Sequence, residues 1–263
     1  MIKQFTLLLL TSLGFSHSFA QDTVTPDNSQ VLNYTFAEDE KVIRFNKGKL
    51  KVSADMFNKS TKNSVRLFAC LDCHGKNAQG GDFFSEEGTF YNPSLVGLSR
   101  DYIKSELISF KRKERIADEM NIIASLLTDE TIDYMAAAFS AYPSVPIIPY
   151  EDINNLIKKD ALFRKGKRIA MQGDDNKVIA CFACHGMNGI GAMGPRLAGQ
   201  SAGYIRTQMA NYRNEIRGSK SIMKEIAVNI TNQDIAAVAH YYESLSDTNR
   251  YSFKDKFVYE KDE

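Results

Sequence analysis

Two short stretches of the chain carry the same pattern of cysteine and histidine. The first is Cys70-Leu71-Asp72-Cys73-His74-Gly75 and the second is Cys181-Phe182-Ala183-Cys184-His185-Gly186, and together they use all four cysteines. Two thiols three positions apart lie on one helical turn, so each can add to a vinyl group of one porphyrin, and the next residue then points its imidazole at the iron. The spacing therefore predicts two covalently attached c-type haems, with His74 and His185 as iron ligands. The predicted attachment points are Cys70, Cys73, Cys181 and Cys184.

Other chemistry of paired cysteines fits this pattern less well. Zinc ribbons place their two pairs about 15–20 residues apart, whereas more than a hundred residues separate the pairs here. A thioredoxin-like dithiol would belong to a βαβ pattern, which neither stretch has. Structural disulfides are compatible with export but give no reason for the His-Gly that follows both pairs.

Residues 1–20 have the features of a secretory signal peptide. Lys3 gives a positive start, residues 5–15 form an apolar run, and Ser18-Phe19-Ala20 is a small-x-small cleavage site. The run is too short for a permanent membrane anchor, and no later stretch is apolar enough to cross a bilayer. The sequence predicts a soluble protein in the periplasm, where bacteria attach haem to such motifs, with no transmembrane segment and at most peripheral contact with the membrane surface.

The composition is that of an ordinary globular protein, with 43% apolar and 25% charged residues and a formal net charge of +1. Nucleic-acid binding would call for a basic excess, so this balance argues against it. The length after export suits two domains of about a hundred residues each.

The predicted N-terminal extension, residues 21–53, begins with a polar segment. Its second part has loosely alternating apolar residues on both sides of Asn46-Lys47-Gly48, which predicts a short β-hairpin. The alternating residues are Val42, Ile43, Phe45, Leu50 and Val52.

The rest of the chain repeats itself, which predicts two copies of one domain. Asn92-Pro93-Ser94-Leu95-Val96-Gly97 corresponds to Gly194-Pro195-Arg196-Leu197-Ala198-Gly199, and Met120 corresponds to Met223. The main difference is a longer loop in the first copy, residues 76–91, which is rich in glycine and acidic residues.

Both copies end in a predicted amphipathic helix, at 128–139 and 231–242. Apolar residues recur at i, i+3, i+4 and i+7, Thr128 and Thr231 are suitable N-caps, and Asp234 completes a capping-box pattern. Between the copies, Pro143, Pro146 and Pro149 favour an extended linker. We therefore predict a first domain at 54–142, a linker at 143–150, a second domain at 151–245 and a tail at 246–263.

The tandem motifs, each followed by Pro-x-Leu-x-Gly, a lone methionine and a capped last helix, resemble the dihaem cytochrome c4 family. The resemblance covers roughly residues 57–245 and leaves out the extension and the tail. It departs at Ser60, where the second copy has Gly166; a small residue there lets the first and last helices cross closely. The resemblance implies an all-α fold of two tandem class I cytochrome c domains related by a pseudo-two-fold axis.

The resemblance also implies the remaining haem contacts. In this family the loop before the last helix supplies a thioether to the iron, which corresponds to Met120 and Met223. The spare histidine His240 is the alternative, but it falls where the first copy has Ala137, so we expect it to be an ordinary surface or hydrogen-bonded residue. The carbonyls of Pro93 and Pro195 are expected to accept the Nδ1 hydrogen of His74 and His185 and so to fix their tautomers.

Two axial protein ligands leave no open position on either iron, so the prediction is an electron carrier that is not an enzyme. By resemblance, its partners would be the cytochrome bc1 complex or a dehydrogenase as donor and a terminal oxidase as acceptor. The alternative is an electron-accepting subunit of a flavin-dependent sulfide dehydrogenase or a similar complex, because its haem domains would look the same. Basic residues outnumber acidic ones between Arg164 and Lys224; either this is a solvated face or the molecule is dipolar.

Overall fold

The computed structural model describes residues 41–45, 48–52, 70–85, 88–142, 144, 146–174, 178–218 and 220–246. All described residues belong to one of the two units into which the chain divides, Phe36–Glu263. The predicted signal peptide, the first part of the extension, the start of the first domain up to residue 69, Ser60 included, and the tail after residue 246 lie outside the described residues.

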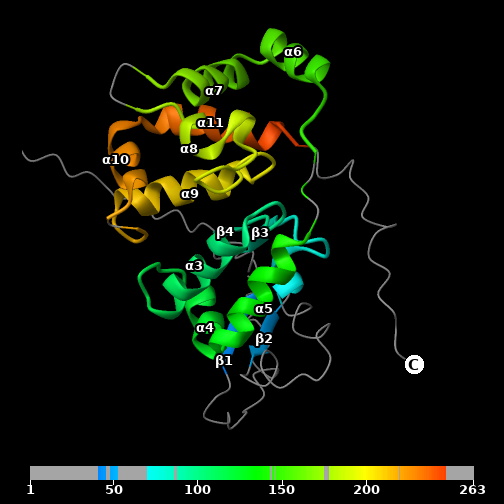
Figure 1. Cartoon of the computed structure of the whole chain (residues 1–263), viewed down its shortest axis with the longest axis vertical. Coiled ribbons are helices and arrows are strands. Elements are labelled where there is room, and N and C mark those ends of the chain that lie inside the picture. The colour runs from blue at the N-terminus through cyan, green and yellow to red at the C-terminus, as the bar shows by residue number, and fades with distance from the viewer. Residues whose placement is uncertain are drawn as a thin grey trace, which may run out of the picture. The chain divides into compact units, whose positions relative to one another are not determined.

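The first half of the repeat, residues 70–142, is built on three helices: α3 (Arg100–Lys111), α4 (Asp118–Leu126) and α5 (Asp129–Ser140). The haem-binding motif forms a separate helical turn at residues 70–74. Helix α3 packs against both α4 and α5 (Figure 1). The largest buried cluster of this half contains Leu71 of the motif together with Ile103, Met135, Ala136 and Phe139.

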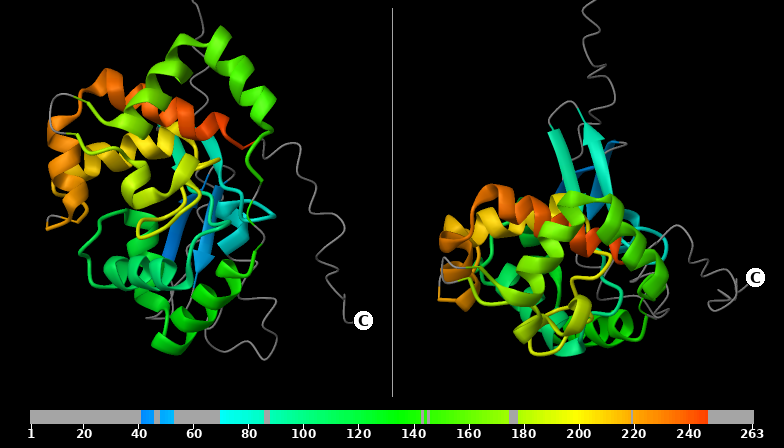
Figure 2. Two further views of the ribbon diagram at one scale, coloured as in Figure 1. Left: turned by 45° about the horizontal axis from the view of Figure 1, so that its top comes forward. Right: turned by 90° about the horizontal axis from the view of Figure 1, so that it is seen from above.

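The second half, residues 146–246, follows the same plan after its motif, and here the structure also describes two helices that precede the motif. Its helical elements are α6 (Tyr150–Lys159), α7 (Ala161–Gln172), α8 (Phe182–His185), the 3-10 turn η2 (Met187–Gly189), α9 (Ala202–Arg213), α10 (Ile222–Asn229) and α11 (Asn232–Ser244). Helix α11 packs against α7 and α9, and α10 packs against α9 (Figure 2). The predicted domain start at residue 151 thus falls inside α6, whose Ile153 is buried in the core of this half.

Side-chain caps mark where six of these helices begin. Ser99, Thr128, Asp160, Ser201, Ser221 and Thr231 each accept a hydrogen bond from a backbone N–H of the first turn. Such a bond satisfies one of the donors that a helix start leaves open. The predicted caps Thr128 and Thr231 are confirmed, and Thr231 Oγ1 also donates to Asp234 Oδ2 at 2.6 Å.

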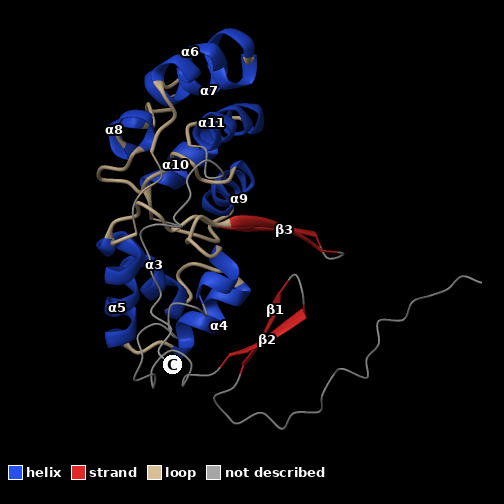
Figure 3. Ribbon diagram, turned by 90° about the vertical axis from the view of Figure 1, so that its right-hand side faces the viewer, coloured by secondary structure: helices blue, strands red, loops and turns tan. Residues whose placement is uncertain are grey.

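Two β-hairpins accompany the helices (Figure 3). The first pairs β1 (Lys41–Phe45) with β2 (Gly48–Val52) in antiparallel register, as the sequence predicts. The second pairs β3 (Gly81–Ser85) with β4 (Gly88–Asn92) and lies in the segment predicted as a loop. Aromatic and β-branched residues on both sides of Glu86-Glu87 explain these strands.

Gly166 marks the place where α7 and α11 cross. A β-carbon added there would lie 2.0 Å from the carbonyl oxygen of Ala237 and 2.8 Å from Cβ of Tyr241. Backbone cannot yield as a flexible side chain can, so the two helices approach this closely only with glycine at 166. This agrees with the small residue that the resemblance implies.

The two halves meet through reciprocal hydrogen bonds. Arg115 donates to the Tyr204 hydroxyl at 2.7 Å, and Arg217 donates to the Tyr102 hydroxyl at 2.7 Å. Both guanidinium groups also pair with the carboxylate of Glu106, which is their shared counter-ion. Arg115 and Tyr102 correspond to Arg217 and Tyr204 in the repeat, so the contacts follow a pseudo-two-fold relation. Glu106 has no such match, because Gln208 stands at the corresponding position.

Three further contacts close this interface. The side chain of Gln200 accepts from the backbone N–H of Ser94 at 2.9 Å and donates to its carbonyl at 3.0 Å. Ser201 donates to Asp82 in β3 of the second hairpin at 2.8 Å. A β-carbon at Gly203 would lie 1.9 Å from Cε1 of Tyr91, so the end of β4 rests directly on α9. Strand and helix are thereby fixed to each other across the two halves.

We predict that Gly166→Ala destabilises the protein. Its β-carbon would push α7 from α11, and overpacking of this kind costs about 1–3 kcal/mol, more than the gain in helix propensity of about 1 kcal/mol. The midpoint of thermal unfolding of the haem-loaded protein should fall. Gln172→Ala, at the exposed end of the same helix, is the control. An unchanged midpoint in Gly166→Ala would show that the helices do not need this close approach.

We also predict that Glu106→Gln destabilises the interface. The variant leaves two buried guanidinium groups without their carboxylate, and removing one partner of a buried ion pair costs about 3 kcal/mol or more. Burial alone would raise the pKa of Glu106, but Arg217 and Arg115 outweigh it and hold the pKa below its usual range. The stabilisation is therefore present above the pKa of an unfolded glutamate and is lost as pH falls through the lower folded pKa.

Denaturant unfolding at several pH values checks this prediction. The difference in unfolding free energy between the parent chain and Glu106→Gln should shrink on acidification. Glu114→Gln, at an exposed position near the same interface, should show no such difference. Equal stability of Glu106→Gln and the parent chain at neutral pH would contradict a stabilising role for the shared carboxylate.

Candidate haem sites

Each motif forms one helical turn that ends at its histidine. In the second half this turn is α8, and Gly186 ends it with a φ of 77°; Gly75 has a φ of 83° after the first motif. Glycine adopts this left-handed conformation without strain. The backbone then turns back, so that Gly80 N–H donates to the His74 carbonyl and Gly191 N–H to the His185 carbonyl. The backbone conformation of this turn therefore explains why glycine follows each motif.

A proline carbonyl fixes each histidine. His74 Nδ1 lies 2.8 Å from the carbonyl oxygen of Pro93, and His185 Nδ1 lies 2.8 Å from that of Pro195. A carbonyl only accepts, so the hydrogen sits on Nδ1 and Nε2 is left with its lone pair available to a metal. The hydrogen bond implied by the resemblance is thus present in both halves.

Burial keeps these imidazoles neutral. It is the main cause that lowers the pKa of His74 and of His185 below the usual range, although the proline carbonyls act in the opposite direction. A neutral imidazole is the form that can donate an electron pair to iron.

The second motif packs closely against the loop that follows it. A β-carbon at Gly194 would lie 2.8 Å from Cε1 and Nδ1 of His185, so this glycine leaves room for the imidazole. Gly194 N–H also donates to the Cys184 carbonyl at 2.7 Å. In the first half the side chain of Asn92 takes over this bond to the Cys73 carbonyl, at 2.9 Å. Both motifs are therefore braced from their own loops.

The two methionines predicted as distal ligands lie at equivalent places. Met120 is in the first turn of α4 and Met223 in the first turn of α10, and both are half-buried. The segment predicted as a loop is therefore a short helix in both halves, between the long middle helix and the last helix. Ser221 caps α10 and accepts from the N–H of Met223 at 3.1 Å.

The alternative ligand His240 has another partner. Its Nε2 lies 2.7 Å from Oδ2 of Asp160, the N-cap of α7. This hydrogen bond joins α11 to the start of α7. His240 thus has the character of a hydrogen-bonded surface histidine, as the sequence comparison between the copies suggested.

The charge pattern of the sequence does not show that two basic residues of the second half are buried. Arg196 and Arg217 were counted in the basic face of the second half, yet they are 7% and 5% exposed. Arg196 donates to the Ala198 carbonyl and to Ser246, and Arg217 belongs to the interface. These two arginines are therefore buried and do not contribute to an exposed basic face. The repeat alignment offered a signal, since Arg115 and Arg217 correspond to each other.

No helix in the described part of the chain is long and apolar enough to span a membrane. Also within that part, no group of three or more His, Cys, Asp or Glu side chains is arranged to hold a bare metal ion. The two cysteine pairs belong to separate halves, in line with one haem motif each.

Comparison with known proteins also supports covalently bound c-type haems. A family model described as cytochrome c matches residues 163–246. A thiosulfate dehydrogenase electron acceptor from Stutzerimonas stutzeri is 32% identical over 67% of this chain and 79% of its own length. A cytochrome c4 from Thiocapsa roseopersicina is 31% identical over 67% of this chain and 87% of its own length. A solved cytochrome c4 from Acidithiobacillus ferrooxidans covers 67% of this chain and 98% of its own length, with a TM-score of 0.53 and 32% identity.

The paired Cys-x-x-Cys-His turns, their proline carbonyls and these similarities agree. The protein is an electron-transfer cytochrome with covalently bound c-type haems, and the chain belongs to the dihaem cytochrome c4 family.

Proposed function

We propose that the protein is a periplasmic carrier that takes up two electrons, one at each haem, and transforms no substrate. The observation that carries this proposal is the pair of neutral, buried imidazoles, each fixed by a proline carbonyl at 2.8 Å. Cys70, Cys73, Cys181 and Cys184 would hold the haems. His74 and Met120 would be the axial ligands in the first half, and His185 and Met223 in the second.

This ligand set favours electron exchange over catalysis. When bound, each haem supplies the one-electron step between Fe(II) and Fe(III). A thioether ligand favours the reduced iron and so raises the reduction potential. If a histidine and a methionine both bind each iron, peroxide, oxygen or thiosulfate would find no vacant coordination position. The residues of this chain then act by holding the ligands still, so that little rearrangement accompanies electron transfer.

The partners follow from the same proposal. We propose the cytochrome bc1 complex or a dehydrogenase as electron donor and a terminal oxidase as acceptor. The bonds between Arg115, Arg217, Tyr102 and Tyr204 hold the two halves together, and this supports electron passage between the haems within one molecule. A loosely tethered pair of domains would shuttle electrons without that internal step.

A second candidate is the role of acceptor for one particular dehydrogenase of sulfur compounds. It is favoured by the similarity to thiosulfate dehydrogenase electron acceptors from Stutzerimonas stutzeri and Thiomonas intermedia. A flavin-dependent sulfide dehydrogenase would use a similar dihaem subunit. In these cases the chain still carries electrons, and the substrate is oxidised by the partner.

We predict that Met223→Ala opens the iron of the second half. The weak sulfur-to-iron band at the red edge of the oxidised spectrum should fall by about half, because one of two thioethers is lost. The reduction potential of that haem should also fall, since water or hydroxide stabilises Fe(III) better than a thioether does. Met187→Ala, at a methionine that is 56% exposed, should leave the band intact. A full band in Met223→Ala would mean that another residue binds the iron.

Stopped-flow kinetics would test the carrier proposal. The reduced protein should be reoxidised by membranes that contain a terminal oxidase, and it should not turn over peroxide, thiosulfate or sulfide alone. Rapid reduction by added thiosulfate dehydrogenase with thiosulfate would favour the second candidate. Strong catalysis by the isolated protein, or isolation with a flavoprotein and no reaction with the oxidase, would overturn the free-carrier role.

A further inference from the structure

Asn121, the residue after Met120, makes three hydrogen bonds at the start of α4. Its Oδ1 accepts from the N–H of Ala117 at 2.8 Å. Its Nδ2 donates to the carbonyls of Phe110 at 2.7 Å and Arg115 at 2.8 Å. All three bonds are partly buried, so their loss would leave backbone groups poorly satisfied. The side chain therefore ties the first turn of α4 to the end of α3 and to residues 115–117.

Residues 115–117 are bonded on their other side by the second half. The Arg115 side chain donates to Tyr204 at 2.7 Å and to Gln208 at 2.9 Å. The N–H of Ile116 donates to the carbonyl of Ile216 at 3.1 Å. One three-residue segment thus lies between the domain interface and Asn121, and a shift of the interface would be transmitted to the turn that carries Met120.

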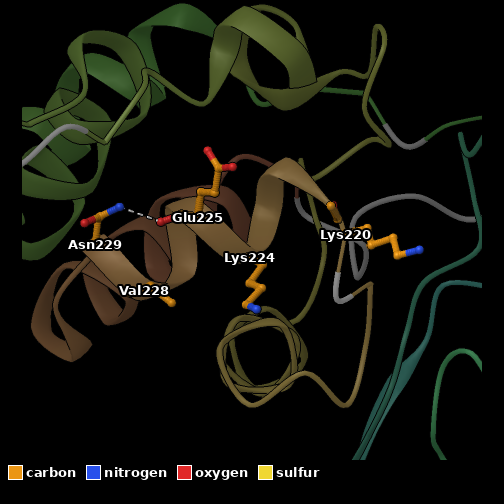
Figure 4. A pocket seen from close by; sticks show the side chains of 6 residues that line it. Lys220, Lys224, Glu225, Val228 and Asn229 are labelled. Atoms are coloured by element: carbon orange, nitrogen blue, oxygen red, sulfur yellow. Dashed lines mark hydrogen bonds between the residues drawn. The ribbon is translucent and has the colours of Figure 1, made fainter.

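The second half has a different residue at this place. Lys224 follows Met223 as Asn121 follows Met120, and it pairs with Glu215, whose side chain is 57% exposed. In Figure 4 the side chains of Lys224 and Glu225 leave α10 in different directions, and Lys224 lines a surface pocket with Lys220, Val228 and Asn229. An ion pair this exposed contributes little to stability. Among the described residues of the second half, the residue after the methionine therefore makes no link like that of Asn121, and the start of α10 is held by Ser221, whose N–H donates to the Gly218 carbonyl.

We propose that Asn121 is a positioning residue that couples the domain interface to the hold of Met120 on the first iron. The inference rests on the proposed ligation by Met120. Contacts between the halves keep residues 115–117 in place, Asn121 transmits this to α4, and the thioether stays on the iron. Loosening of the interface releases Met120 more readily than Met223.

Imidazole is a suitable probe, because it binds ferric haem only when the methionine has left. Its apparent affinity then rises in proportion to the fraction of iron without methionine. In a Met223→Ala chain the red-edge band reports the first half alone, and imidazole abolishes it. Adding Asn121→Ala should tighten apparent imidazole binding about tenfold, which is equivalent to about 1.4 kcal/mol. Ser125→Ala, in the same helix, removes only an exposed local bond and should cause no change.

A double-mutant cycle tests the coupling itself. Tyr204→Phe removes a hydroxyl that Arg115 bonds, so it should tighten imidazole binding to the first half while Asn121 is present. In the Asn121→Ala chain the same substitution should have little further effect. In a Met120→Ala chain, where the band reports the second half, Asn121→Ala should leave imidazole binding unchanged.

The possible results separate the two proposals. Unchanged imidazole affinity in Asn121→Ala, or fully additive effects of Tyr204→Phe and Asn121→Ala, would overturn the coupling while Met120 remains the ligand. A lower unfolding temperature without altered imidazole binding would reduce Asn121 to a structural residue. If Met120→Ala leaves the whole red-edge band, the ligand assignment fails and this inference fails with it.

Discussion

The hydrogen bond from each proximal imidazole to a proline carbonyl is the constraint around which both halves are built. A carbonyl at 2.8 Å from Nδ1 leaves Nε2 available and holds the ring in one orientation, while burial keeps the imidazole neutral. The connecting loops may then differ. Nineteen positions separate the bonded residues in the first half and ten in the second, and the hairpin of β3 and β4 takes up the difference. The loop varies in length while its two ends remain fixed.

The interface between the halves shows how a duplicated domain loses its symmetry. Arg115 and Arg217 keep the reciprocal tyrosine contacts that a pseudo-two-fold relation predicts. One carboxylate, Glu106, serves both guanidinium groups, and its counterpart Gln208 contributes only a neutral acceptor. Asn121 and Lys224 differ in the same way beside the two methionines. The two haem environments of one chain are thus unequal although their motifs are alike.

The sequence predicts those structural features that depend on residues close together in the chain. The two motifs, the capped helices at Thr128 and Thr231 and the first hairpin could be predicted because each has a local physical signal. The hydrogen bonds of Pro93 and Pro195 followed from family resemblance. The hairpin of β3 and β4 was missed because glycine and acidic residues suggested a loop. The burial of Arg217 could not be predicted, because it depends on side chains more than a hundred positions away. Arg196 likewise bonds Ser246, which is fifty positions away.

The hydrogen bonds and ion pairs between the two halves could not be predicted for the same reason. Nothing near Glu106 in the sequence indicates that it faces Arg217, and Asn121 resembles an ordinary polar helix residue until residues 115–117 are placed. Long-range contacts of this kind are set by the packing of the two halves. They decide how the ligands are held, whereas the motifs decide which cofactor is held.

An optical redox titration of the purified haem-loaded protein tests the central claim most directly. Two one-electron steps per chain are expected, with both ferric haems low-spin and the red-edge band present in proportion to two thioethers. Only one electron per chain, or a ferric haem that is high-spin in the unmodified protein, would contradict the account of two closed haems with histidine and methionine ligands.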